Sequence, residues 1–167
     1  MAARFNIEKL SAKHDRSRFD CGSEPLNRYF TQQVTQDIRR RVAACFVAVT
    51  SAGAIAGYYT LASASVPLAD LPPDTARKLP RYPSLPAVRM GRLAVDRQFK
   101  GQGLGAVLLA DALTRALSSD IAAFALIVDA KDDAAAAFYR HHGFLAFDDN
   151  PRALFLPLAT AKALPRA

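Results

Sequence analysis

Hydrophobic residues recur along the chain with two different periods, about two residues in predicted strands and about 3.6 residues in predicted helices. The predicted elements end where one period gives way to the other. In the first third, short apolar runs predict strands, while a capping serine with an early proline and helical spacing predict helices. The elements expected there are a strand at Phe5–Leu10, a helix that begins at Ser23–Pro25, a helix at Val34–Arg41, and a hairpin of strands at Ala44–Thr50 and Ile55–Ser63.

The second half of the chain alternates between strand and helix patterns. The expected elements are a strand at Val88–Val95, a helix at Leu104–Ser118, a strand at Phe124–Asp129, a helix at Asp133–His142, and strands near Phe144–Phe147 and Leu154–Leu158. The order strand, helix, strand implies a right-handed crossover and a parallel pair of strands. The pattern predicts an α/β fold with a mixed sheet of about six or seven strands and about four helices.

Prolines divide these two halves. Six of the ten prolines fall between Ala64 and Ala87. Because proline fixes φ and has no backbone N–H, this stretch predicts neither a continuous helix nor a central strand. We expect a long connection there, with one helical turn at Asp74–Lys78. Connections of this length in compact domains are usually functional.

Composition indicates a folded globular protein. Of the 167 residues, 51% are hydrophobic and 22% are charged. A chain of this length and composition predicts a single domain with a sizeable core. We place that domain at residues 1–160 and expect a frayed C-terminal tail at residues 161–167.

The same composition bears on the cellular compartment. No apolar run approaches the roughly 20 residues needed to cross a bilayer, and the first residues have no signal-peptide core. We therefore expect a cytoplasmic protein that does not bind a membrane. Cys21 and Cys45 stand far apart in the sequence, so we expect reduced structural thiols and no metal site.

Net charge adds a first indication of function. The chain carries 22 Lys and Arg residues against 15 Asp and Glu residues, a net charge of +7, and arginine supplies 16 of the basic residues. Arginine binds phosphate oxygens through a planar fork of donors, so this excess is typical of a nucleotide-binding or nucleic-acid-binding protein. The alternative is a basic surface that is merely solvated.

Glycine spacing after the strand at Val88–Val95 points to the same ligand chemistry. Gly101, Gly103 and Gly105 follow that strand, and a helical pattern begins among them. Glycines allow backbone N–H groups to converge on one point, and the helix N-terminus adds unpaired N–H groups and its positive dipole end. The spacing predicts a pyrophosphate site, although the dinucleotide pattern G-x-G-x-x-G and the P-loop pattern are both absent.

The segment Gln98-Phe99-Lys100-Gly101-Gln102-Gly103 resembles the acyl-coenzyme A signature of the GNAT superfamily of N-acetyltransferases, Gln/Arg-x-x-Gly-x-Gly/Ala. Its first position is glutamine rather than the commoner arginine, and the family permits either. The resemblance implies acetyl-CoA as cofactor and a single GNAT fold whose central parallel strands splay apart, with the pantetheine arm pairing with the first strand. It assigns these residues to cofactor binding: Leu93, Ala94, Val95, Gln98, Lys100, Gly101, Gln102, Gly103, Leu104, Gly105, Ala106, Asp132 and Phe138.

A second family landmark, F-Y-x-x-x-G-F, is present at Phe138–Phe144. The family commonly uses a tyrosine at the position of Tyr139 to protonate the coenzyme A thiolate. A phenol with a pKa of about 10 keeps its proton at neutral pH and is therefore suited to this role. The alternative is that Tyr139 is a core aromatic. His141 and His142 end the helix, where a cation suits the dipole, and we expect neither to be catalytic.

Three further segments resemble the GNAT toxins of bacterial toxin–antitoxin modules: Phe19–Tyr29, Gly57–Ala62 and Gly91–Asp96. Those toxins acetylate the α-amine of aminoacyl-tRNA and stop translation, and a ribbon-helix-helix antitoxin is encoded beside them. The resemblance implies the same acetyl transfer, an antitoxin partner and a homodimer. The alternatives are acetylation of a protein N-terminus, a lysine or a small amine, and a non-catalytic module that binds CoA or a partner.

Charge helps to choose among these acceptors. An enzyme for cationic amines is expected to present carboxylates, whereas a tRNA acetyltransferase must hold a polyanion. We expect tRNA phosphate contacts from Arg39, Arg40 and Arg41 on the early helix and from Arg77, Lys78, Arg81, Arg89 and Arg92. The predicted strands offer no obvious Glu or His base. This favours an α-amine, because its pKa of about 7.7 to 8.0 leaves much of it neutral at cytosolic pH.

Overall fold

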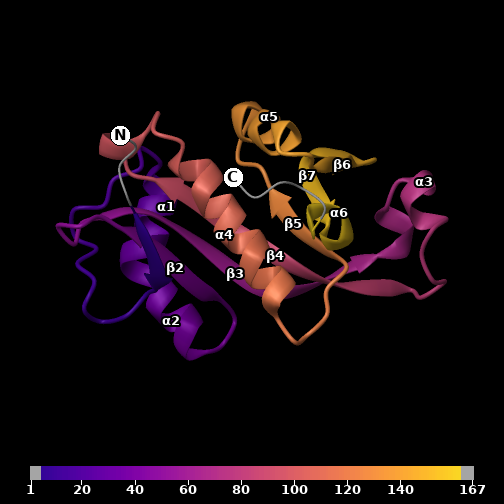
Figure 1. Ribbon diagram of the computed structural model, residues 1–167, viewed down its shortest axis with the longest axis horizontal. Helices are drawn as coiled ribbons and strands as arrows, with labels where there is room; N and C mark the ends of the chain where they lie inside the picture. The colour runs from indigo at the N-terminus through magenta and orange to yellow at the C-terminus, as the bar shows by residue number, and fades with distance from the viewer. Residues whose placement is uncertain (1–4, 163–167) are drawn as a thin grey trace. The chain divides into compact units, whose positions relative to one another are not determined.

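The fold, obtained as a computed structural model that describes residues 5–162, is built on a seven-stranded mixed sheet in the order β1-β2-β3-β4-β5-β7-β6 (Figure 1). The strands are β1 Asn6–Lys9, β2 Ala44–Val49, β3 Ile55–Pro67, β4 Ser84–Val95, β5 Ala125–Asp129, β6 Leu145–Phe147 and β7 Asn150–Pro157. The helices are α1 Glu24–Arg28, α2 Val34–Arg39, α3 Pro73–Ala76, α4 Leu104–Ser118, α5 Asp133–His141 and α6 Leu158–Lys162. The predicted mixed α/β fold is confirmed.

The sheet contains the predicted parallel pair. Strands β4 and β5 run parallel, with a register that extends from Ala87 opposite Ala125 to Met90 opposite Val128. Strand β1 pairs with β2, β2 with β3, and β7 with both β5 and β6, all antiparallel. The splaying of β4 and β5 beyond this register stays a prediction.

The chain divides into two compact units. Unit 1 comprises Met1–Ala62 and Gly91–Ala112, and unit 2 comprises Ser63–Met90 and Leu113–Ala167. The single domain expected at residues 1–160 stays a prediction. Within the expected tail, residues 161 and 162 end α6, and residues 163–167 lie outside the described part of the chain.

Stacked aromatic rings form the centre of unit 1. Phe30 stacks on Tyr58 with ring centroids 4.2 Å apart, and Phe19 packs edge-on against both rings. The hydroxyl of Tyr58 donates to Leu26 O at 2.8 Å, which ties α1 to β3. Such rings bury large apolar areas, and the pairing geometry adds a little more. The N-terminal helices are therefore fixed against the sheet.

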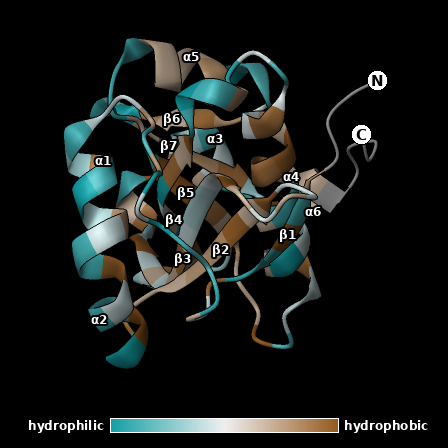
Figure 2. Cartoon of the chain, turned by 90° about the vertical axis from the view of Figure 1, so that its left-hand side faces the viewer, coloured by the Kyte–Doolittle hydropathy of each residue, from teal (hydrophilic) through white to brown (hydrophobic). Residues whose placement is uncertain are grey.

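The N-terminal helical stretch contains a π-helix, η1 Tyr29–Gln33, between α1 and α2. Hydrophilic residues predominate on α1 (Figure 2). The expected helix at Val34–Arg41 ends two residues early, at Arg39. Arg40 is the C-cap and Arg41 has a left-handed φ of 60°. The expectation that Arg40 and Arg41 lie on this helix is wrong, because the chain reverses there into β2.

In unit 2, the expected long connection at residues 64–87 is shorter than predicted. Strand β3 runs to Pro67 and β4 begins at Ser84, so the two ends of this segment are strand. The missing N–H of proline is tolerated there, because Pro67 ends its strand and Pro86 lies near the start of β4. The remaining connection folds as the 3-10 turn η2 Leu68–Asp70 and as α3, which begins one residue before the expected turn.

The core of unit 2 lies around β4, β5 and β7. Ala125, Ile127 and Phe155 are buried together with Leu85 and Ala87. Four successive residues of β5 are buried, as expected of a strand covered on both faces. Within residues 5–162, no helix combines the length and the apolar character that a membrane span requires.

Candidate active site

The predicted coenzyme segment lies in unit 1, where β4 ends and α4 begins. Between them the 3-10 turn η3 Arg97–Phe99 is capped by Asp96, whose Oδ1 accepts from Gln98 N at 2.9 Å. Gly101 and Gly103 have φ of +80° and +79°, and the space where a Cβ would stand is open at both. Only glycine adopts this backbone at little cost, so the loop is built to keep its main chain exposed.

Helix α4 supplies the second half of this site. Val107 N donates to Gly103 O at 3.2 Å, so the helical hydrogen bonds begin at Gly103. The N–H groups of Leu104, Gly105 and Ala106 precede the first residue that can pair within the helix, and they share the positive dipole end. Exposed backbone in the loop and unpaired N–H groups at the helix start are the chemistry that a diphosphate requires. The residues present therefore fit a coenzyme pyrophosphate.

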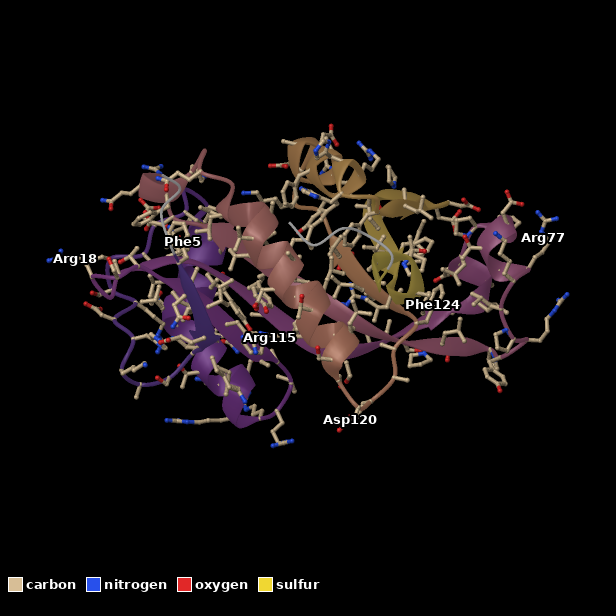
Figure 3. The ribbon with its side chains drawn as sticks, in the orientation of Figure 1. Phe5, Arg18, Arg77, Arg115, Asp120 and Phe124 are labelled. Carbon is tan, nitrogen blue, oxygen red and sulfur yellow. The ribbon has the colours of Figure 1, made fainter. Side chains whose placement is uncertain are left out.

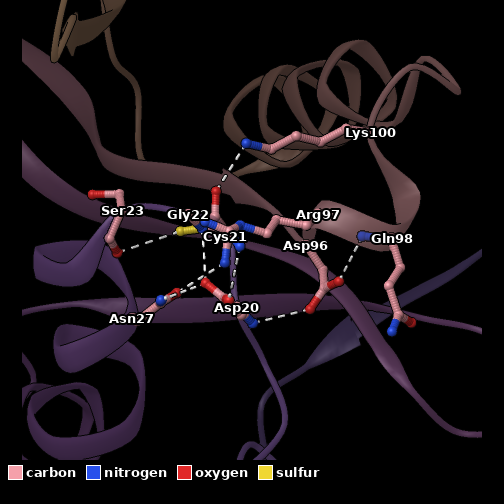
Figure 4. Close-up of polar contacts among 9 residues, drawn as sticks. All are labelled: Asp20, Cys21, Gly22, Ser23, Asn27, Asp96, Arg97, Gln98 and Lys100. Atoms are coloured by element: carbon pink, nitrogen blue, oxygen red, sulfur yellow. Dashed lines mark hydrogen bonds and ion pairs between the residues drawn. The ribbon is translucent and has the colours of Figure 1, made fainter.

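The side chains of the loop are partly engaged elsewhere. Lys100 Nζ donates to Cys21 O at 2.8 Å, and Arg97 Nη1 lies 3.7 Å from Asp20 Oδ2 (Figure 4). An ammonium has three donors, so Lys100 keeps two for another acceptor. Gln98 and Gln102 are exposed, while Ala94 in β4 is buried. Sequence reasoning did not anticipate that the loop is held by an N-terminal segment.

The remaining predicted site residues lie in unit 2, on and before α5. Asp132 is the N-cap of this helix and accepts from Ala135 N at 2.8 Å. Phe138 is half-buried and packs edge-on against Tyr139, with ring centroids 5.3 Å apart. These contacts give Asp132 and Phe138 structural roles, and their predicted contact with the cofactor stays a prediction.

Tyr139 combines a buried ring with an unused hydroxyl. The residue is 6% exposed and packs against Phe138 and Phe144. Its hydroxyl makes no hydrogen bond with any described residue. In the described part of the chain, every polar side-chain atom that is fully enclosed has a hydrogen-bond partner. The hydroxyl therefore reaches solvent. Burial, and then the negative charge of Asp129, raise the pKa of Tyr139 well above its usual value, so the phenol stays protonated at neutral pH.

Unit 2 also contains a pocket of about 290 Å³. Val66, Ile127 and Phe147 contribute apolar surface, and an ion pair between Arg89 and Asp129 contributes polar surface. Asp129 also acts electrostatically on the pKa of Tyr139, so the pocket and the candidate acid have this carboxylate in common, although Tyr139 does not line the pocket. Its other lining residues are Ser65, Pro67, Asp70, Val128, Asp149, Asn150 and Ala153. The walls of this pocket come from four distant segments with no shared motif, so the sequence alone does not predict it.

The basic residues expected to contact tRNA fall into two groups. Arg77 and Arg89 form ion pairs with Asp74 and Asp129, and Arg92 lies over the ring of Tyr29. Arg77 projects outward near the end of α3 (Figure 3). In contrast, these residues are exposed and have no ion-pair partner in the described part of the chain: Arg39, Arg40, Arg41, Lys78 and Arg81.

Other groups considered from the sequence have structural surroundings. Burial, and then His141, lower the pKa of His142, which disfavours its cationic form at this helix end. Both cysteines are free and buried, and burial raises the pKa of Cys45 to about 12. Among the described residues, no group of three or more His, Cys, Asp or Glu side chains could hold a metal ion.

Comparison with known proteins gives a consistent set of relatives. Residues 9–144 match the family model described as the acetyltransferase (GNAT) family. The chain is 35% identical over 158 residues to a tRNA-acetylating toxin of Mycobacterium tuberculosis, and the match covers 93% of each chain.

Two solved structures are also similar. A structure of AtaT complexed with acetyl-methionyl-tRNAfMet has a TM-score of 0.84 at 33% identity, covering 95% of this chain and 98% of that one. A tyrosine-to-phenylalanine mutant of the toxin AtaT, bound to acetyl-CoA and to the C-terminus of the antitoxin AtaR, has a TM-score of 0.78 at 30% identity, covering 95% and 96%.

Proposed function

Because the chain belongs to the GNAT family of acetyltransferases, we propose that it transfers acetyl from acetyl-CoA to the α-amine of an aminoacyl-tRNA and thereby acts as a toxin that blocks translation. The observation that carries this proposal is Tyr139, whose ring is buried and whose hydroxyl remains protonated and available. The relative named a tRNA-acetylating toxin and the AtaT complex with acetylated tRNA support the choice of acceptor.

The glycine loop and the start of α4 are the proposed coenzyme site. Acetyl-CoA supplies an acetyl thioester, which is activated toward attack by an amine. The backbone N–H groups between Gly101 and Ala106 would hold its pyrophosphate, since they are exposed or unpaired. The main chain of Leu93–Val95 is the proposed partner of the pantetheine arm. Binding energy at these remote groups orients the reacting end and lowers the barrier to transfer.

Tyr139 is the proposed general acid. The hydroxyl oxygen holds a proton at neutral pH because burial and Asp129 disfavour the phenolate. It would donate that proton to the sulfur as the bond between the acetyl carbon and sulfur breaks, so that coenzyme A leaves as the thiol rather than as the thiolate. The residue acts only when negative charge develops on sulfur, and it therefore contributes to the transition state rather than to ground-state binding.

The pocket lined by Asp129 is the proposed site for the aminoacyl end of the tRNA. Its apolar residues Val66, Ile127 and Phe147 suit an amino-acid side chain, and the Asp129 carboxylate can accept an N–H from the amine. An α-amine with a pKa of about 7.7 to 8.0 is partly neutral at physiological pH. The reaction therefore does not depend on a strong base in the protein.

Partners follow from the same proposal. We propose a ribbon-helix-helix antitoxin that neutralises the enzyme and a homodimeric assembly, with action in the cytoplasm where aminoacyl-tRNA is used. The AtaT structure with the C-terminus of the antitoxin AtaR supports the antitoxin. The exposed basic residues Arg39, Arg41 and Arg81 are the proposed contacts with tRNA phosphates.

A transfer assay with purified protein tests the proposal. The chain is incubated with isotope-labelled acetyl-CoA and total aminoacyl-tRNA, and the 3′-aminoacyl adenosines released by nuclease are analysed by mass spectrometry. We expect N-acetyl-aminoacyl adenosine from one or a few amino acids. Transfer to peptides, lysine or polyamines but not to aminoacyl-tRNA would identify a different acceptor. Acetyl-CoA binding without any transfer would identify a non-catalytic module.

A further inference from the structure

An N-terminal segment is joined to the coenzyme loop by several hydrogen bonds within unit 1. We define the N-terminal clasp as Asp20, Cys21, Gly22 and Asn27. Asp20 N donates to Asp96 Oδ2 at 3.0 Å, and Asp20 O accepts from Arg97 N at 2.9 Å. Lys100 Nζ donates to Cys21 O at 2.8 Å. The clasp and the loop are separated by more than seventy residues in the chain, so these bonds are tertiary contacts.

The clasp is held by hydrogen bonds among its own residues (Figure 4). Asp20 Oδ1 accepts from Gly22 N and from Asn27 Nδ2, both at 2.9 Å. Asn27 Oδ1 accepts from Cys21 N, also at 2.9 Å. Gly22 has a φ of +87°, and a Cβ on it would lie 3.2 Å from Arg97 Nε. Each backbone N–H from Asp20 to Gly22 therefore has a partner. The clasp also lies so close to the loop that a side chain in place of Gly22 would crowd Arg97.

The clasp fixes the half of the loop that precedes the flexible glycines. Asp96 is 7% exposed, and its carboxylate bridges Asp20 N and Gln98 N. Gly101 and Gly103 follow directly, and a Cβ at either would contact nothing within 4 Å. Glycines lose more conformational entropy on ordering than other residues. A loop that is already held at Asp96, Arg97 and Lys100 loses less entropy when it binds a ligand.

Charge also favours this arrangement. Hydrogen bonds from Asn27 and then Gly22 lower the pKa of Asp20, so the carboxylate is charged at neutral pH and faces the guanidinium of Arg97. Without the Asp20 carboxylate, the hydrogen bonds from Gly22 N and Asn27 Nδ2 and the ion pair with Arg97 are lost. The main-chain bonds to the loop remain, but the turn that positions the carbonyl of Cys21 for Lys100 is less well held.

We propose that the N-terminal clasp presets the coenzyme loop and that Asp20 is a positioning residue for acetyl-CoA binding, which it supports without touching the coenzyme. This inference rests on the proposed function, because it takes the loop as the coenzyme site. It predicts that a residue remote in sequence from the signature controls coenzyme affinity. The chemical step, which depends on Tyr139 in unit 2, is left unchanged.

The test compares Asp20→Ala with Asp15→Ala. Asp15 is a matched control, because its carboxylate accepts from the residue two positions on, Ser17, as Asp20 does from Gly22. By calorimetry, Asp20→Ala should raise the acetyl-CoA dissociation constant about tenfold, while kcat at saturating acetyl-CoA stays within about twofold of wild type. Asp15→Ala should change neither. Asp20→Asn, which keeps the acceptor oxygen but loses the charge, should fall between wild type and Asp20→Ala.

A second measurement separates local positioning from general destabilisation. In hydrogen exchange, the peptide spanning residues 97–105 of coenzyme-free Asp20→Ala should exchange faster than in wild type and should return to the wild-type rate at saturating acetyl-CoA. A lowered melting temperature with an unchanged dissociation constant overturns the inference. If wild type binds no acetyl-CoA, the proposed function itself fails. If wild type binds it and Asp20→Ala binds equally well, only the role of the clasp fails.

Discussion

The guanidinium carbon of Arg92 lies 3.5 Å from the centroid of the Tyr29 ring, and the hydroxyl of that ring donates to Asp37 Oδ2 at 2.7 Å. The cation, the ring and the carboxylate thus form a chain of contacts that links β4 to the N-terminal helices. Arg92 is half-buried. Its expected contact with tRNA phosphate stays a prediction, and the structure gives it a second role in holding unit 1 together.

Arg92→Lys tests that second role. Lysine keeps the positive charge but loses the planar group that stacks on the ring, so the free energy of unfolding should fall by about 1 kcal/mol. Urea denaturation followed by circular dichroism measures the change. Arg39→Lys, on the exposed end of α2, is the control and should be neutral. Unchanged stability in Arg92→Lys would argue against a packing role for this arginine.

Tyr139→Phe removes one hydroxyl and leaves the ring to fill the same space. If Tyr139 is the general acid, kcat should fall by roughly 10² to 10⁴ while the acetyl-CoA dissociation constant barely changes. Because the hydroxyl makes no hydrogen bond with a described residue, the melting temperature should also stay close to wild type. Growth arrest on expression without antitoxin provides an independent readout. Full toxicity of this variant would contradict the assignment.

The raised pKa of Tyr139 predicts how the reaction rate depends on pH. A general acid must be protonated, and burial keeps this phenol protonated beyond its usual pKa of 10. The rate should therefore rise with pH as the acceptor amine loses its proton at about 7.7 to 8.0, and it should then stay level up to about pH 10. An aminoacyl-tRNA analogue with a 3′-amide linkage resists hydrolysis over this range. A descending limb between pH 8 and 9 would mean that another acid is used.

Exposed arginines without a carboxylate partner should contribute most to tRNA binding. Arg39→Ala combined with Arg41→Ala should raise the KM for aminoacyl-tRNA and should reduce the slope of log affinity against log salt by about 1 per lost phosphate contact. Filter binding at several salt concentrations measures that slope. Arg77→Ala is the control, because Arg77 is exposed but paired with Asp74. An effect of Arg77→Ala that is half as large as that of the double variant would point to net charge alone, since it removes one charge rather than two.

Gly57→Ala should destabilise unit 1. A Cβ on Gly57 would lie 2.9 Å from Ala94 O and 2.9 Å from Leu108 Cδ1, so the backbone of β4 and the buried side chain of Leu108 would have to move. Overpacking of this kind typically costs about 1 to 3 kcal/mol. Gly91→Ala is the control, since its Cβ would meet the Thr60 hydroxyl at 3.2 Å. Thermal unfolding of both variants measures the difference, and equal stability would show that β4 and the Leu108 side chain adjust at little cost.

The order of elements and the glycine loop could be predicted because each depends on local sequence. Glycines at residues 101 and 103 after an apolar strand specify a left-handed turn before a helix, and the structure has that turn. The end of β3 at Pro67 and the start of β4 at Ser84 could not be predicted from the local sequence. A proline cannot donate a hydrogen bond to a neighbouring strand, but it can adopt strand conformation at a position where no such bond is needed.

The site was only partly predictable for a related reason. The positions of Tyr139 and the loop follow from motifs, whereas the pocket and the clasp depend on which distant segments pack together. Asp20 lies in the segment Phe19–Tyr29 that resembles the toxins and Asp15 does not, but the sequence assigns no role to the Asp20 carboxylate. In the structure both carboxylates accept a hydrogen bond from the residue two positions later. Its contact with the coenzyme segment exists only because the folded chain brings Asp20 N to Asp96.

The π-helix at Tyr29–Gln33 has a genetic consequence. Val34 N donates to Tyr29 O, a wider turn that holds one residue more than an α-helical turn. Deleting the codon of one exposed residue here, such as Gln32, would leave the ordinary hydrogen-bond spacing of an α-helix. Because the wide turn already absorbs its extra residue, the side chains after it would keep their direction, and Asp37 would still face the hydroxyl of Tyr29. Deleting a residue within α2 would instead rotate every following side chain by about 100°. A one-residue deletion should therefore be tolerated in the π-helix and not in α2.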